Sequence, residues 1–224
     1  MRAPRGNTMD IAGLQRAIGA TPDGKWGPAS RAALLDKFSN RGALAISTGQ
    51  MQAFADRLGV SLRQLAAVAK VESSGAAFDS WGRPKILFER HIFHRQTDGR
   101  WSVCSFSNPQ GGGYGEDSWD KLLDAAGKSP DAAFAACSWG RYQVLGAHWS
   151  ALGYSSSYAL AASTATSEAA HYDLLCRFIE KNGMKAAMQA ISSDPADCKA
   201  FARGYNGPSY QTFDYHLKLA RAMR

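Results

Sequence analysis

Apolar side chains recur every three or four residues along most of this chain of 224 residues, which is the spacing of amphipathic helices. In residues 9–39, Leu14 and Ile18 belong to one short apolar face, and Leu34 and Phe38 belong to another. Between them, TPDGKWGP contains Asp-Gly and Gly-Pro pairs that favour a tight turn. The pattern therefore predicts a helical hairpin.

Helical spacing also dominates the rest of the chain. Two helices are predicted around Gly59, with Ser61 as the N-cap of the second. Residues 78–115 are less periodic, and PKILFERHIF within them favours a strand or a short helix. Helical patterns return in 118–128, 129–149, 166–183, 183–191, 194–207 and 209–223. The expected fold is mainly α, an α+β arrangement with a small β or irregular element in its middle.

The polar, glycine-containing stretch NRGALAISTG at residues 40–49 has the composition of a linker. It separates the hairpin from the longer helical part of the chain. We therefore expect a short helical module at residues 8–42 and a second domain at residues 48–224.

The net charge of +7 favours an anionic partner such as nucleic acid, a membrane surface or a cell-wall polymer. The basic residues are scattered, however, so an ordinary soluble basic protein explains the charge equally well. The N-terminus lacks the apolar segment of a signal peptide, and no apolar run is long enough to span a bilayer, so we expect a cytoplasmic location. Cysteine spacing predicts reduced, mostly buried thiols at Cys104, Cys137, Cys176 and Cys198.

Glu72 stands out because it shares a helix face with apolar residues. On a helical wheel it falls within about 60° of Leu65, Val68 and Ala69, whereas Lys70 lies on the opposite side. An apolar environment and the negative end of the helix dipole both raise the pKa of a carboxyl group, as a general acid requires. The alternative is a glutamate at a frayed helix end that points into solvent.

Other catalytic chemistries have weaker support in the sequence. His91 and His94 are three residues apart, but HExxH and a third ligand at metalloprotease spacing are absent. Cys137 is expected inside an alanine-rich helix, where it packs rather than reacts. NPQGGGYG lacks the lysine of a phosphate-binding loop. We therefore expect no metal and no cofactor.

The hairpin carries a family resemblance. LQRAIGATPDGKWGPASRAALLDKF resembles the LQ…DGxWGPxTxxAL signature of small peptidoglycan-binding modules in cell-wall hydrolases. The resemblance implies cell-wall contacts by Asp23, Gly24, Trp26 and Gly27. The alternative is a hairpin that only packs on the main domain.

A second resemblance covers residues 50–220. VESSG, SWGRYQVLG and GYNGPSY are similar, in this order, to the ES, GxxQ and AYNxG motifs of goose-type lysozymes and lytic transglycosylases. With the segment GRPKILFERHIFHR, they resemble more closely the N-acetylmuramidase domain of phage endolysins. The resemblance implies a lysozyme-like fold and cleavage between N-acetylmuramic acid and N-acetylglucosamine. It places Glu72 as the catalytic acid and assigns substrate contacts to Ser73, Gly140, Gln143, Tyr205 and Asn206.

Aromatic side chains near these motifs are candidates for stacking on sugar rings, although each also suits a protein core. These candidates are Tyr114, Trp119, Trp139 and Tyr142.

A partner carboxylate for Glu72 is less evident from the sequence. Hydrolysis of a glycoside commonly uses two carboxylates, whereas a lytic transglycosylase acts with one glutamate. The candidates for the second carboxylate are Asp79, Glu89, Glu116 and Asp117. Glu89 is favoured by its apolar context in ILFERH. The residues leave both reactions open, and the resemblance favours hydrolysis.

As a member of such a family, the protein is expected to act as a monomeric phage endolysin on peptidoglycan strands. It is expected to wait in the host cytoplasm until a holin-like pore opens, and its basic charge suits an anionic envelope rather than nucleic acid. The alternatives are a lytic transglycosylase that forms 1,6-anhydro ends, a non-catalytic wall-binding protein and, as a minor one, a wall peptidase or amidase.

Overall fold

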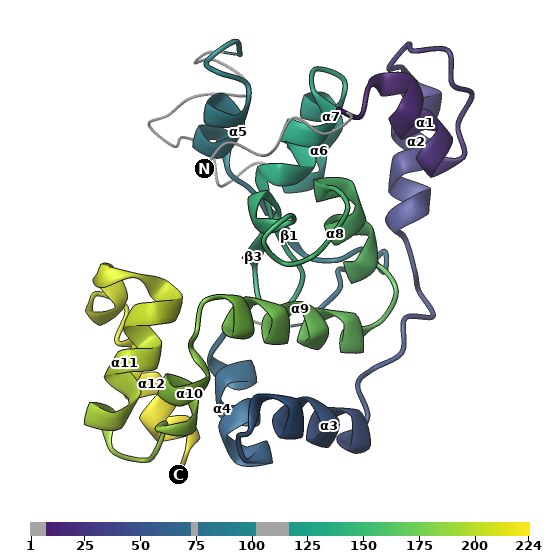
Figure 1. The fold of residues 1–224 in the computed structure, drawn as a ribbon. Coiled ribbons are helices and arrows are strands. Elements are labelled where there is room, and N and C mark those ends of the chain that lie inside the picture. The colour runs from purple at the N-terminus through teal and green to yellow at the C-terminus, as the bar shows by residue number, and fades with distance from the viewer. Residues whose placement is uncertain (1–7, 73–75, 102–116) are drawn as a thin grey trace. The chain divides into compact units, whose positions relative to one another are not determined.

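The computed structural model describes residues 8–72, 76–101 and 117–224, and it consists mainly of helices with one small sheet (Figure 1). The chain forms two compact units. Unit 1 comprises Met1–Ala43 and Phe78–Thr166, and unit 2 comprises Leu44–Ala77 and Ser167–Arg224. The predicted mainly α fold with a small β element is confirmed. The expected module at residues 8–42 lies within unit 1.

Unit 1 contains the predicted helical hairpin and the sheet. Its elements are α1 (Ile11–Ile18), α2 (Pro28–Phe38), β1 (Ile86–Phe88), α5 (Arg90–Gln96), α6 (Ser118–Ala126), α7 (Pro130–Ala135), β2 (Cys137–Trp139), β3 (Val144–Leu145), the 3₁₀ helix η1 (Gly146–His148) and α8 (Ser157–Thr164). The sheet is antiparallel in the order β1-β2-β3. Its register pairs Ile86 with Trp139 and Trp139 with Val144. PKILFERHIF thus forms both a strand and a short helix.

The prediction of one helical stretch over residues 129–149 is wrong. The helix α7 ends at Ala135, and the chain turns into the hairpin β2–β3 because Cys137–Trp139 pairs with β1. The turn contains Gly140 with φ at 68°, a left-handed conformation that glycine adopts without strain. Cys137 therefore lies at the start of a strand rather than in a helix. Helix α8, which the sequence patterns did not predict, also belongs to this part of the fold.

The core of unit 1 is an aromatic cluster centred on Phe38, the last residue of α2. Its ring centroid lies 5.4 Å from that of Trp119, 5.6 Å from that of Trp139 and 6.0 Å from that of Phe134. The ring of Tyr158 meets it edge-on at 6.1 Å. Phe38 has no exposed surface. The N-terminal hairpin therefore supplies part of the core of unit 1.

Among the described residues of unit 2, all regular secondary structure is helical. Its elements are α3 (Thr48–Leu58), α4 (Leu62–Glu72), α9 (Glu168–Lys181), α10 (Lys185–Gln189), α11 (Pro195–Asn206), the 3₁₀ helix η2 (Pro208–Gln211) and α12 (Tyr215–Ala222). Gly59 ends α3 in the left-handed conformation, as the sequence predicts. The expected last helix over residues 209–223 is instead divided, because Asp214 adopts a left-handed conformation between η2 and α12.

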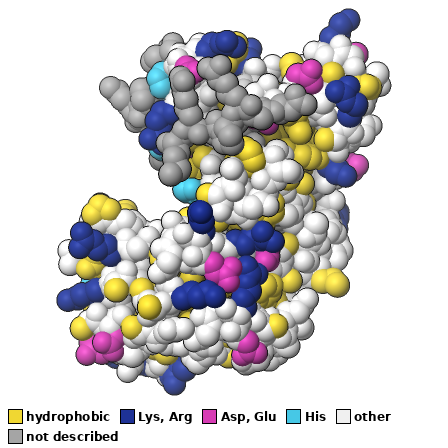
Figure 2. Space-filling model, in the orientation of Figure 1, with side chains coloured by type: hydrophobic (Ala, Val, Ile, Leu, Met, Phe, Trp, Pro, Cys, Tyr) yellow, Lys and Arg dark blue, Asp and Glu magenta, His cyan; other side chains and the backbone are white. Residues whose placement is uncertain are grey.

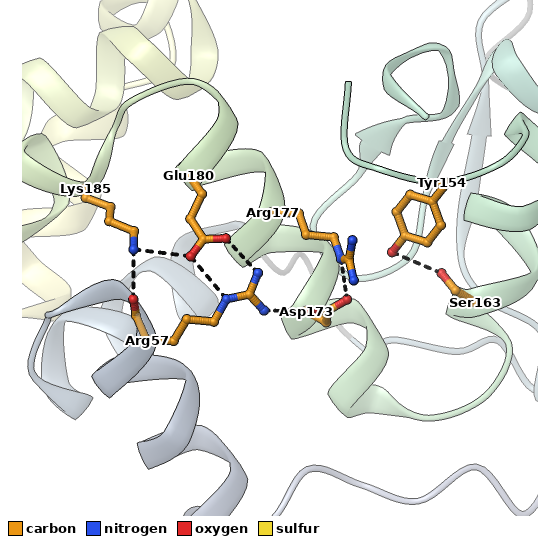
Figure 3. Close-up of polar contacts among 7 residues, drawn as sticks. All are labelled: Arg57, Tyr154, Ser163, Asp173, Arg177, Glu180 and Lys185. Carbon is orange, nitrogen blue, oxygen red and sulfur yellow. Dashed lines mark hydrogen bonds and ion pairs between the residues drawn. The ribbon is translucent and has the colours of Figure 1, made fainter. Parts of the chain in front are cut away.

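An ion-pair cluster joins α3 to α9 within unit 2 (Figure 3). The Arg57 guanidinium donates to both carboxylate oxygens of Glu180, at 2.7 and 3.2 Å, and to Asp173 at 2.6 Å. Lys185 donates to the backbone carbonyl of Arg57 at 2.9 Å and pairs with Glu180 at 3.2 Å. These contacts fix α3 against α9. Within unit 1, the same figure shows the hydroxyl of Ser163 bonded to that of Tyr154.

The surface carries dispersed charge. Lys and Arg side chains are spread over the face shown in Figure 2, several of them beside Asp or Glu side chains. Three of the cysteines, Cys137, Cys176 and Cys198, are buried free thiols as expected, whereas Cys104 lies outside the described residues. Among the described residues, no helix has the length and apolarity needed to cross a membrane.

Acid should weaken the α3–α9 contact. The hydrogen bonds from Arg57, ahead of other causes, lower the pKa of Glu180 below its usual value. The stability that Glu180 contributes is therefore present above pH 4.5, its unperturbed pKa, and is lost as the pH falls through the lower pKa of the folded state. We expect Glu180→Gln to cost about 0.5–1 kcal/mol of unfolding free energy at pH 7 and to reduce the loss of stability in acid.

Thermal unfolding between pH 3 and 7 measures this effect. Asp36→Asn, which changes an exposed carboxylate on α2, is the matched control and should follow the wild type. Equal acid sensitivity of the wild type and E180Q would contradict the prediction.

Candidate functional site

Glu72 is the last residue of α4, a helix whose start and buried face agree with the sequence prediction. Ser61 accepts from the backbone N–H of Gln64 at 3.1 Å, and the Gln64 side chain accepts from the N–H of Ser61 at 2.9 Å, which together form a capping box. The predicted apolar face is buried, because Leu65 and Val68 have no exposed surface. The side chain of Glu72, like the whole of Ser73, lies outside the described residues.

The motif residues Gly140 and Gln143 form the turn between β2 and β3. The N–H of Gly140 donates to the carbonyl of Lys85 at 2.8 Å, which fixes the turn to the residue before β1. The side-chain amide of Gln143 donates to the carbonyl of Gly140 at 2.7 Å. Gln143 is exposed and has φ at 49°, a conformation that costs a residue other than glycine about 1 kcal/mol. An exposed, strained glutamine at a fixed turn is a candidate for ligand contact.

Glu89 is the N-cap residue of α5, where strand β1 gives way to the helix. Its backbone N–H donates to the carbonyl of Ala136 at 2.8 Å, which ties it to the end of α7. Its side chain is 17% exposed and its carboxylate lies 3.6 Å from Nδ1 of His91. Burial raises the pKa of the Cys137 thiol well above its usual value, and the charge of Glu89 adds to this effect. Glu89 is thus a largely buried carboxylate beside the sheet.

The other described candidates for the second carboxylate have structural roles. Asp79 pairs with Nε of Arg83 at 2.7 Å and accepts from the backbone N–H groups of Trp81 and Arg83 at 2.9 Å each. Asp117 is the N-cap of α6 and accepts from the N–H of Trp119 at 2.7 Å. Glu116 lies outside the described residues. Glu89 remains the favoured candidate for the second carboxylate because it is largely buried beside the sheet.

Three of the aromatic stacking candidates are core side chains. Trp139 has no exposed surface, Tyr142 is 2% exposed and Trp119 is 4% exposed. A sugar needs an open ring face, so the burial of these rings favours the core role that the sequence also allowed. Tyr114 lies outside the described residues.

Tyr205 and Asn206 end helix α11 in unit 2. The Tyr205 ring stacks on Phe201 and on Tyr215, with centroids 5.7 and 6.4 Å apart, and meets Phe178 edge-on. Asn206 is exposed, and Gly207 after it has φ at 74°. The aromatic neighbours thus fix Tyr205 and leave Asn206 at the surface. Glu72 belongs to the same unit, whereas Glu89, Gly140, Tyr142 and Gln143 belong to unit 1.

The DGKW turn of the N-terminal hairpin is held by a buried glutamine. The Gln15 side chain donates to Asp23 at 2.8 Å and to Ser30 at 2.9 Å, and it accepts from the N–H of Gly24 at 2.8 Å. The backbone N–H of Lys25, ahead of Gln15, lowers the pKa of the Asp23 carboxyl. These contacts fix the Asp-Gly turn against Gln15 of α1.

Trp26 of the same turn docks onto helix α6 of unit 1. Its indole N–H donates to the carbonyl of Leu123 at 2.7 Å. A Cβ at Gly127 would lie 2.4 Å from the Trp26 ring, so glycine is needed at this close approach. Arg31 pairs with Asp124, and the N–H of Met9 donates to Asp131 at 2.7 Å. Trp26 therefore has a structural partner, whereas Gly27 begins α2 as its N-cap.

Among the residues the structure describes, no group of three or more His, Cys, Asp or Glu side chains has the arrangement of a metal site. His91 and His94 both lie in α5.

One exposed aromatic residue, Trp81, was not among the predicted candidates. It is 55% exposed and precedes Gly82 in the turn that Asp79 organises. A single tryptophan in a turn gives no periodic signal, so only the composition of DSWGRP could have drawn attention to it.

The chain is similar to proteins of known family and structure. A family model described as N-acetylmuramidase matches residues 61–224. The crystal structure of Burkholderia AP3 phage endolysin is similar to this chain, with a TM-score of 0.73 and 31% sequence identity. That similarity covers 100% of this chain and 96% of the endolysin, and so includes the N-terminal hairpin. No curated protein sequence matches this chain.

The contact of Trp26 with unit 1 predicts a stability effect. We expect Trp26→Ala to lower the unfolding free energy by about 2 kcal/mol, because it removes a half-buried ring and a hydrogen bond. Lys25→Ala, at an exposed position of the same turn, is the matched control. Thermal unfolding and binding to purified sacculi should both be measured. Lost sacculus binding with unchanged stability would contradict the docking role.

The strained turn makes a separate prediction. Gln143→Gly relieves the left-handed strain and loses the side-chain hydrogen bond to Gly140 and a longer one to Lys85, so the gain and the loss, each about 1 kcal/mol, should nearly offset each other in stability. We expect lysis of cell-wall substrate to fall about tenfold. Asp98→Gly, at φ 52° in another turn, is the control and should keep full activity. Equal activity of Q143G and the wild type would remove Gln143 from the candidate site.

Proposed function

Because the chain belongs to the N-acetylmuramidase family, we propose that it cleaves the β-1,4 bond between N-acetylmuramic acid and N-acetylglucosamine in peptidoglycan, with Glu72 as general acid. The observation that carries the proposal is the family match over residues 61–224, which includes α4 and its terminal Glu72. The buried apolar face of α4 supports it, since this packing fixes the backbone that presents the carboxylate.

The residues have distinct roles in the proposed reaction. Glu72 donates a proton to the glycosidic oxygen as the bond to the leaving sugar breaks. Glu89 is the proposed second carboxylate, and it either activates water or stabilises the positive charge on the muramyl ring. Gln143 and Asn206 supply exposed side-chain amides for the N-acetyl substituents. The backbone of Gly140 and the hydroxyl of Ser73 are further proposed contacts to the glycan.

The biological role follows from the same comparison. Similarity over the whole chain to a phage endolysin supports a role in host lysis by degradation of the cell wall. In this role the enzyme collects in the host cytoplasm as a monomer and reaches the wall through a holin-like pore. The net charge of +7 favours encounter with the anionic envelope at low salt.

The hairpin has a proposed second role in wall contact. Asp23 and Gly24 are exposed in the DGKW turn and remain accessible to a wall polymer, together with the outer part of the half-buried Trp26 and Gly27. The docking of Trp26 on α6 means that such contact occurs with the hairpin held on unit 1.

Replacement of Glu72 tests the catalytic proposal. We expect Glu72→Gln to reduce clearing of a sacculus suspension by at least about 100-fold, because the proton donor is lost, while binding to sacculi is retained. Asp36→Asn, an exposed carboxylate on α2, is the control and should keep wild-type activity. Full clearing by E72Q would contradict the proposed role.

The products released by the wild type and by Glu89→Gln should be analysed by mass spectrometry. Reducing muramic acid ends indicate hydrolysis, whereas 1,6-anhydro ends indicate the alternative transglycosylase reaction. Free peptides would indicate a peptidase or amidase. If Glu89 activates water, E89Q should lose hydrolysis about 100-fold.

A further inference from the structure

Trp81 is the exposed tryptophan of the part of the chain that the structure describes. Its side chain is 55% exposed, in a protein whose other large aromatic rings in unit 1 mainly fill the core. An aromatic ring in water loses the free energy that its burial would provide, about 2 kcal/mol or more for a large side chain. A residue of this kind in an ordered turn is a candidate for ligand binding.

One face of the Trp81 ring is occupied by a guanidinium group. The Arg83 carbon Cζ lies 4.7 Å from the Trp81 ring centroid and 5.1 Å from that of Trp119. Trp119 is buried and its ring packs at a tilt against Phe38, so Arg83 connects the exposed ring to the core. Arg83 itself is 8% exposed. Since Arg83 covers one face of Trp81, the exposed area belongs to the opposite face and the edge.

The turn that carries Trp81 is rigidly held. Asp79 accepts from the backbone N–H groups of Trp81 and Arg83 and pairs with the Arg83 side chain at 2.7 Å. Gly82 has φ at 77°, and its carbonyl accepts from the N–H of Asn40 at 3.0 Å. A Cβ at Gly82 would lie 2.7 Å from the backbone of Asn40 and Arg41. The ring is therefore preorganised, which lowers the entropy cost of binding.

A hollow of about 270 Å³ adjoins this turn. It lies in unit 1 and is lined by the polar Asn40, Arg41, Asp79 and Ser80, by Gly82, and by the apolar Ala43 and Phe78. Ligand pockets are usually about 300–1,000 Å³, so the hollow accommodates part of one sugar residue and its substituents. An open aromatic face beside polar side chains suits a ring with C–H groups on one face and hydroxyl or amide groups at its edge.

We propose that Trp81 is a stacking platform for an N-acetylhexosamine ring of a glycan strand, with the adjoining hollow receiving the substituents of that sugar. This inference deepens the proposed muramidase function and rests on it for the identity of the glycan. Arg83 acts as a positioning residue, since it packs on the face of the Trp81 ring opposite to the one proposed to bind the sugar.

The test measures binding in the Glu72→Gln background, so that cleavage does not interfere. The probes are tetra-N-acetylchitotetraose, by calorimetric titration, and purified sacculi, by sedimentation. We expect Trp81→Ala to weaken binding of both probes about tenfold. Trp81→Tyr should retain most of the affinity because it keeps a flat ring, whereas Trp81→Leu should resemble W81A because it keeps apolar volume alone.

Leu44→Ala is the matched control, because it removes another exposed apolar side chain, 75% exposed, and should bind as tightly as E72Q alone. Circular dichroism of each variant checks that the fold is kept. Equal affinity of W81A and its parent would overturn the proposal, as would equal affinity of W81L and W81Y. A loss confined to sacculi would also overturn it, since the partner would then be a wall component other than the N-acetylated sugar. Full lytic activity of E72Q would contradict the proposed function instead, and the affinity differences would still stand.

Discussion

The burial of Phe38 is the packing constraint on which unit 1 depends. This side chain comes from the N-terminal hairpin, yet its neighbours come from α6, α7, β2 and α8. Removing a buried phenylalanine of this kind typically costs about 3–5 kcal/mol, a large share of the stability of a domain. The hairpin thus fills the core that supports the sheet, and the Gly140–Gln143 turn is an extension of that sheet.

Arg83 links this core to the surface, because its guanidinium contacts both the buried Trp119 and the exposed Trp81. A guanidinium between two tryptophan rings gains cation–π attraction on both faces, and the Asp79 carboxylate neutralises its charge where it is buried. Because Trp119 contacts Phe38 directly, the orientation of Trp81 depends on a chain of packed groups that begins in the hairpin. The packing of the hairpin therefore helps to fix the orientation of the proposed sugar platform.

The sequence predicted local structure better than long-range structure. The capping box at Ser61 and the buried face of α4 follow from residues within one turn of each other, so their periodicity sufficed. Strand β2 was not predicted because it forms only by pairing with β1, which lies some fifty residues earlier in the sequence. In this pairing Ile86 lies opposite Trp139. All three residues of β2 are buried, so no alternation of polar and apolar positions marks it as a strand.

In the candidate site, too, local features were predictable from the sequence and long-range ones were not. The motif residues were found through a resemblance, whereas the distinction between a core ring and an exposed ring requires tertiary structure. Trp139 and Trp81 are both followed by glycine in the sequence, in SWGRYQ and SWGRPK, yet one has no exposed surface and the other is 55% exposed. Local composition cannot separate the two. Pairing with β1 buries Trp139, whereas the Asp79 turn leaves Trp81 outside the core.

Asn40 forms hydrogen bonds near the points where the chain passes from one unit to the other. The chain crosses after Ala43, Ala77 and Thr166. Asn40 donates from its backbone to Gly82 at 3.0 Å and from its side chain to the carbonyls of Ala165 and Thr166 at 3.1 Å each. One residue of unit 1 therefore ties together segments close to all three crossings. The Trp81 turn rests on this residue through Gly82, so the platform is anchored where the chain leaves unit 1 rather than on a free loop.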